Sequence, residues 1–157
     1  VMYFNLGTID YLENLYEQAY FNFAESLRIA EDLRYKTMIA CALEGFAACA
    51  AAAGNFVQSA KISGATDTLR EEIGYKTEPA EEIFRAEYLT KTRAALSEKQ
   101  FSALYLQGQN LNSDEAAALV LQKQLPEQND FTDETYTEII IEHHKIERIT
   151  IDEKIEP

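Results

Sequence analysis

The alternation of large and small apolar residues between positions 41 and 60 is the clearest pattern in the chain. Leu43, Phe46 and Ala50 follow helical spacing, so they lie on one face of a helix. Gly54 suits the left-handed conformation that ends many helices, and Phe56 begins the next apolar series. The segment predicts two helices joined by a tight turn. Its run of alanines at 50–53 would let neighbouring backbones approach closely.

A second copy of this pattern lies 40 residues earlier. The apolar residues from Leu12 to Ala30 keep steps of three or four, which is typical of an amphipathic helix. Asn14 takes the place of Gly54, Tyr16 takes the place of Phe56, and large and small residues match at the aligned positions. Internal periods of about 20–50 residues are typical of solenoids. The sequence therefore predicts helical hairpins that stack side by side.

Capping signals divide the rest of the chain, up to residue 125, into further helices. We expect the helix after Phe56 to end near Ile73 with Gly74 as its cap, and Pro79 to open a third long helix. A short helix should then end at Gly108, and a last one should cover residues 116–124. Two capping-box sequences open these later helices: Ser97 with Gln100, and Asn112 with Glu115.

The segment after residue 125 differs in composition. Residues 135–141 and 146–151 are rich in β-branched side chains, which favours a small β-hairpin. The spacing of His143, Ile146 and Ile149 also fits a helix, so both alternatives stay open. Residues 126–157 hold three basic and ten acidic residues. The sequence thus predicts an all-α repeat domain over residues 1–125, with about three hairpins and one extra helix, and an acidic tail over residues 126–157.

Charge and hydropathy exclude several classes of function. The 157 residues carry a net charge of -13, whereas nucleic acids and anionic membranes bind clustered Lys and Arg. No apolar run reaches the roughly 18 residues of a membrane span, and the first ten residues lack the basic start of a signal peptide. Cys41 and Cys49 lie eight residues apart on one helix, too far for a disulfide. We therefore expect a cytoplasmic protein in which this domain binds neither nucleic acid nor membrane.

Motifs for catalysis, phosphate binding and metal binding are not found in the sequence. None of the six glycines begins a GxxxxGK pattern, and no serine or cysteine is placed with a histidine. His143 and His144 lack the spacing of metal ligands. We expect no enzyme activity, no cofactor and no metal site.

The apolar pattern of the two copies resembles the tetratricopeptide repeat, a helix–turn–helix of about 34 residues. The residues that carry this resemblance are Leu6, Gly7, Asn14, Leu15, Tyr16, Ala19, Phe23, Ser26 and Leu27. Asp10 and Ser63 depart from the repeat, which usually has an aromatic residue at both positions.

Residues 41–121 are also similar to the C-terminal part of large bacterial signalling ATPases and LuxR-type transcriptional regulators. The shared phrases are ALEGFAACAAAAGNFVQSAKISGATDTLREEIG and LNSDEAAALVL, with Arg85 and Tyr88 between them. The ATPase module is not part of this sequence, and the chain starts inside a repeat. The resemblance therefore implies a fragment of a longer protein.

In the tetratricopeptide family the first helix of each repeat lines a concave groove. By position, the resemblance implies a partner-binding groove formed by Phe4, Thr8, Tyr11, Glu44, Ala48 and Ala51. This groove lacks the basic residues that clamp a peptide carboxylate. Its small residues suit an apolar helix, supplied by a partner or by the chain's own third hairpin. Ordinary packing or solvent contact at these positions is the alternative.

The function expected from these features is a non-catalytic protein-interaction or sensor arm of a larger signalling ATPase or transcriptional regulator. Its partner would be a protein or peptide segment. One alternative is a structural domain that forms homodimers through the aromatic first repeat or the tail. The other is a small-molecule sensor with its ligand among the same aromatic residues.

Overall fold

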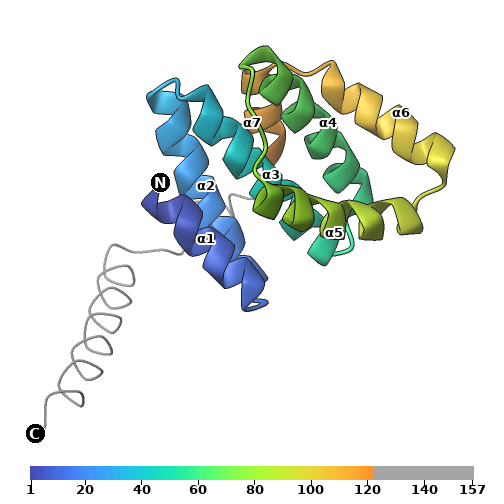
Figure 1. Cartoon of the computed structure of the whole chain (residues 1–157), viewed down its shortest axis with the longest axis horizontal. Helices are drawn as coiled ribbons and strands as arrows, with labels where there is room; N and C mark the ends of the chain where they lie inside the picture. Colours follow the sequence, from blue (N-terminus) through green and yellow to red (C-terminus); the bar gives the residue numbers. More distant parts are fainter. Residues whose placement is uncertain (122–157) are drawn as a thin grey trace, which may run out of the picture. The chain divides into compact units, whose positions relative to one another are not determined.

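A computed structural model of the chain describes residues 1–121. These residues form seven α-helices and no strand, which confirms the predicted all-α helical-repeat architecture (Figure 1). The helices are α1 (Met2–Leu12), α2 (Tyr16–Asp32), α3 (Lys36–Ala52), α4 (Phe56–Glu72), α5 (Pro79–Ala95), α6 (Glu98–Gln109) and α7 (Ser113–Leu121). None of these helices combines the length and the apolar composition needed to cross a bilayer. The predicted tail structure and the domain boundary at residue 125 lie outside the described residues.

Helices α1–α2 and α3–α4 form the two hairpins that the 40-residue repeat predicts. The helices of each pair pack along their length, and α2 packs just as closely against α3. Tyr16 and Phe56 each open the second helix of their hairpin, and both are half-buried. The two copies of the pattern therefore occupy equivalent places.

Left-handed residues follow four successive helices at intervals of 20 residues. They are Asn14 (φ 63°), Arg34 (φ 52°), Gly54 (φ 76°) and Gly74 (φ 63°). In every turn the left-handed residue and its successor donate N–H groups to carbonyls of the last helical turn. The turns predicted at Asn14, Gly54 and Gly74 are confirmed. Residue type alone does not indicate the turn at Arg34, because an arginine side chain disfavours this conformation.

Replacement of Arg34 by glycine is expected to stabilise the protein. The Cβ of a left-handed residue costs about 1–2 kcal/mol, and the greater entropy of glycine in the unfolded chain offsets about half of that. We expect the free energy of unfolding in urea to rise by about 0.5–1 kcal/mol. The matched control is Arg28→Gly in the exposed interior of α2, which should lose about 1 kcal/mol. A loss of stability at Arg34→Gly would contradict the turn geometry.

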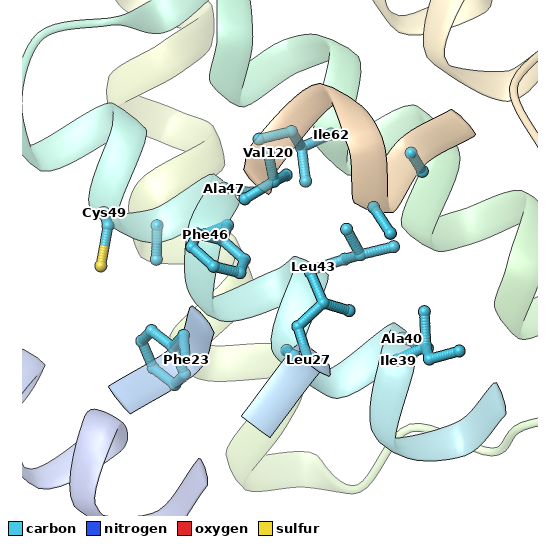
Figure 2. Close-up of a cluster of buried hydrophobic side chains, with 14 of the residues drawn as sticks. Phe23, Leu27, Ile39, Ala40, Leu43, Phe46, Ala47, Cys49, Ile62 and Val120 are labelled. Atoms are coloured by element: carbon cyan, nitrogen blue, oxygen red, sulfur yellow. The ribbon is translucent and has the colours of Figure 1, made fainter. Parts of the chain in front are cut away.

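Helix α3 is the central helix of the described residues. Twelve of its 17 residues are buried, and it packs against α1, α2, α4, α5 and α7. Figure 2 shows side chains from α2, α3, α4 and α7, among them Phe23, Phe46, Ile62 and Val120, gathered in one cluster. The abundance of alanine in α3 permits this close contact on several sides, because a methyl group adds little to the width of a helix.

Phe23 of α2 determines how the first hairpin packs against α3. Its ring lies against Gly7 of α1 and Gly45 of α3, where an added Cβ would come within 2.8 and 2.6 Å of ring atoms. The ring centre lies 5.8 Å from that of Phe4 and 6.3 Å from that of Phe46. The two glycines therefore make room for an aromatic ring between α1 and α3.

Helix α6 packs along α4 through another pair of glycines. A Cβ on Gly64 would lie 2.1 Å from the carbonyl oxygen of Tyr105, and one on Gly108 would lie 1.9 Å from that of Lys61. The prediction that Gly108 ends its helix is wrong, because α6 continues to Gln109. Gly108 instead lets the two backbones touch. The capping boxes predicted at Ser97 and Asn112 are confirmed.

Helices α5 and α7 contact α3 from different directions. Helix α5 packs against α3 and α4, whereas α7 packs against α2, α3 and α4. The hydroxyl of Tyr20 in α2 donates a hydrogen bond to the carbonyl oxygen of Val120 in α7, at 3.0 Å. Helix α5 contacts α6 only slightly, so these two helices do not pair as the first four do. In Figure 1, α6 follows the course of α4, while α5 runs in another direction.

Candidate interaction surface

The six residues of the predicted partner-binding groove differ in their exposure. Phe4 and Thr8 are half-buried, whereas the other four are buried: Tyr11, Glu44, Ala48 and Ala51. The ring of Tyr11 packs edge-on against Phe84 of α5, with ring centres 5.2 Å apart, and Glu44 forms an ion pair with Arg85 of α5. A helix of the same chain therefore occupies part of the predicted groove.

A largely buried cluster of charges joins α5 to α3 and α4. Oε2 of Glu44 lies 2.6 Å from Nη1 of Arg70 and 2.8 Å from Nη1 of Arg85. Nη2 of Arg85 lies 2.6 Å from Oδ1 of Asp67, and the hydroxyl of Tyr88 donates to Oε1 of Glu44. Two carboxylates and two guanidinium groups balance in charge. Such a pairing is what allows ionised groups to be buried together.

Burial controls the protonation of the side chains in this cluster. It raises the pKa of Tyr88 well above its usual range, and the carboxylate of Glu44 raises it further. Burial also raises the pKa of Asp67, against the opposing effect of the Arg85 guanidinium. The Tyr88 hydroxyl therefore remains a neutral hydrogen-bond donor. These ion pairs and hydrogen bonds therefore fix the positions of α3, α4 and α5 relative to one another.

Hydroxyl groups extend this polar contact along α4 and α5. Oγ of Ser59 lies 3.0 Å from Oγ1 of Thr92, and Oγ of Ser63 lies 3.5 Å from the hydroxyl of Tyr88. All four residues are buried. The first copy has Phe23 at the position equivalent to Ser63. A serine at a position where the repeat usually has an aromatic residue was thus the sequence signal for a polar contact between helices. The pairing of Glu44 with Arg85 had no such local signal.

The outer face of α1 is apolar and exposed. Met2, Leu6 and Ile9 follow helical spacing and are 66%, 42% and 52% exposed. No charged side chain lies between them on this face, since Asp10, the single charged residue of α1, bonds to Asn22 of α2. The face formed by Met2, Leu6 and Ile9 is called the α1 outer face below.

The second copy of the repeat buries the equivalent of the α1 outer face. The 40-residue shift relates its three residues to Ala42, Phe46 and Cys49 of α3, which are 0%, 1% and 4% exposed. Rings from α2 cover this part of α3, with Tyr20 and Phe23 centred 4.6 and 6.3 Å from Phe46. Among the described residues, no helix covers the α1 outer face, although the equivalent face of α3 packs against α2.

The two cysteines lie in α3, and both are free and buried. Burial raises the pKa of Cys49 to about 12 and raises that of Cys41 above its usual value. A thiol with a raised pKa stays protonated at neutral pH and is a poor nucleophile. Within residues 1–121, no three His, Cys, Asp or Glu side chains are grouped to hold a metal ion.

Comparison of the chain with protein-family models, with curated proteins and with solved structures finds no match.

Proposed function

We propose that this chain is a protein-interaction module whose α1 outer face binds a helix of a partner protein. The observation that carries the proposal is the contrast between equivalent faces of the two copies. One face is covered by α2, and the other is exposed at Met2, Leu6 and Ile9. Exposed apolar patches of this kind mark interaction sites more often than singly exposed residues do.

The character of the partner helix follows from the helix that covers α3. Helix α2 presents aromatic rings and small residues to its neighbours, including Ala19, Tyr20 and Phe23. A partner with aromatic and small residues at spacings of three or four would pack on α1 in the same way. This is the helix-in-groove mode of recognition, in which a few apolar side chains provide most of the affinity.

We further propose that the module is a non-catalytic arm of a signalling ATPase or a transcriptional regulator. The support for this is the similarity of residues 41–121 to the C-terminal part of such proteins, in which helical repeats follow the ATPase module. Binding at a repeat surface would then report the presence of a partner to the modules attached to it.

A peptide of residues 15–33, which carries the α2 face, tests the proposed binding surface. We expect it to bind the full chain with a dissociation constant of about 0.1 mM or below, because a few apolar side chains must offset the cost of association. Ile9→Glu should weaken binding at least about tenfold, since burial of such a side chain contributes roughly 1.5–3 kcal/mol. Titration of the labelled peptide, followed by fluorescence anisotropy, measures both.

Val57→Glu is the matched control, because Val57 is 47% exposed and lies on α4, away from α1. Binding that is undetectable at millimolar peptide, or that is weakened equally by both variants, would contradict the proposal. Light scattering on the same proteins separates a partner from a second copy of the chain. A dimer that Ile9→Glu dissociates would assign the surface to self-association.

A further inference from the structure

Helix α5 is held against the repeats by polar contacts and by a few apolar side chains, Phe84, Tyr88 and Leu89. Only Tyr88 and Thr92 of its 17 residues are buried, compared with twelve of 17 in α3 and ten of 17 in α4. Ile83 of α5 is 73% exposed. Elements with few buried apolar contacts open at a lower free energy than the core does.

Much of the face beneath α5 is polar and would be compatible with water if α5 left it. Its polar part consists of charged and hydroxyl side chains, which water can solvate: Glu44, Asp67, Ser59 and Ser63. Its apolar part includes the ring of Tyr11, which packs against Phe84. Glu44 also keeps its ion pair with Arg70, because both residues belong to the second hairpin. Removal of α5 therefore does not leave the buried carboxylate of Glu44 unpaired. An unpaired buried charge would be strongly destabilising.

The chain connections allow α5 to move while its neighbours stay packed. Helices α4 and α6 touch through Gly64 and Gly108 without any part of α5. Residues 73–78 join α4 to α5, and six extended residues can span about 20 Å. At the other end, Arg93 of α5 lies over the ring of Phe101 of α6, 3.8 Å from its centre.

From these observations we propose that α5 is a built-in occupant of a second binding face, and that a partner helix with the same surface chemistry displaces it. The partner would carry the pattern of Phe84, Arg85 and Tyr88, an aromatic residue followed by arginine and, three residues later, tyrosine. The arginine would bridge Glu44 and Asp67, and the tyrosine would donate to Glu44, as α5 does now. This face is separate from the α1 outer face, so the proposal stands or falls independently of binding there.

A fluorescein-labelled peptide of residues 78–96 tests the displacement directly on the full chain. A chain that carries Arg85→Ala loosens its own α5, so it should bind the peptide at least about tenfold more tightly than the original chain. Lys91→Ala is the matched control, because Lys91 is exposed on α5 and pairs with Glu87 of the same helix. It should leave the affinity unchanged. Equal affinity for the original and Arg85→Ala chains would overturn the proposal.

A reversible cross-link gives a second, independent readout. Ser59→Cys with Thr92→Cys places two thiols where the hydroxyl oxygens lie 3.0 Å apart, in a background where Cys41 and Cys49 are alanine. The oxidised protein should bind no peptide, and dithiothreitol should restore binding. Peptide binding that is equal before and after reduction would overturn the proposal. If Arg85→Ala fails to fold by circular dichroism, Thr92→Val, which removes one hydroxyl contact, replaces it with the same expected direction.

Discussion

Gly64→Ala is expected to force α4 and α6 apart and to lower the free energy of unfolding by at least about 3 kcal/mol. The added Cβ would lie 2.1 Å from a backbone oxygen of Tyr105, and a backbone atom cannot turn aside as a side chain can. Alanine is about 1 kcal/mol better than glycine inside a helix. The sign of the effect is therefore decisive, because without the close contact the substitution would stabilise the protein.

Urea denaturation with a fitted midpoint and slope measures the effect at Gly64. Gly74→Ala is the control, since Gly74 has open space around it and only its left-handed φ of 63° opposes a side chain. That variant should lose about 0.5–1 kcal/mol, the reverse of the change expected at Arg34. Gly108→Ala should resemble Gly64→Ala, and the double variant should lose less than the sum because both substitutions open the same contact. A stability gain at Gly64→Ala would show that the backbones do not touch.

Glu44→Gln is expected to cost about 3–5 kcal/mol, because it removes the charge that the buried guanidinium of Arg70 and the largely buried one of Arg85 share. Arg70 and Arg85 both lie within 2.8 Å of the Glu44 carboxylate, and the side chain of Glu44 is only 6% exposed. Glutamine keeps the shape and can still accept from Tyr88. The loss therefore reports the charge itself rather than a cavity.

Glu72→Gln is the control for the charge effect, because Glu72 pairs with Lys36 and both side chains are about half exposed. An exposed pair contributes about 0–1 kcal/mol. The two variants should also differ in their response to salt: about 1 M NaCl screens surface charges strongly and buried ones little. If urea denaturation showed the same loss in free energy of unfolding for Glu44→Gln as for Glu72→Gln, the buried pairing of Glu44 with the two arginines would be contradicted.

The parts of the fold that depend on neighbouring residues could be predicted from the sequence. Gly54 and Asn14 indicated left-handed turns because their small or polar side chains tolerate positive φ. Ser97 and Asn112 indicated helix starts because each can bond to a residue three positions later. The 40-residue shift then related the two hairpins, because equivalent packing requires equivalent side-chain sizes.

The parts that depend on distant residues could not be predicted in this way. Gly108 was assigned to a helix end, since a glycine within a helix and a glycine after it look alike until the facing backbone near Lys61 is known. Glu44 was placed in a groove, but its partners Arg70 and Arg85 lie 26 and 41 residues further along the chain. No periodicity relates such charges. The exposure of the α1 outer face likewise depends on how the other described helices pack around it.

The most direct test of the account maps where the peptide of residues 15–33 binds the full, nitrogen-15-labelled chain by amide chemical shifts. The account predicts the largest shifts along α1, around Met2, Leu6 and Ile9, with α4 and α6 unchanged. Shifts confined to α4 or α6, or an unaltered spectrum at saturating peptide, would contradict the claim that α1 carries an open copy of the face that α3 packs against α2.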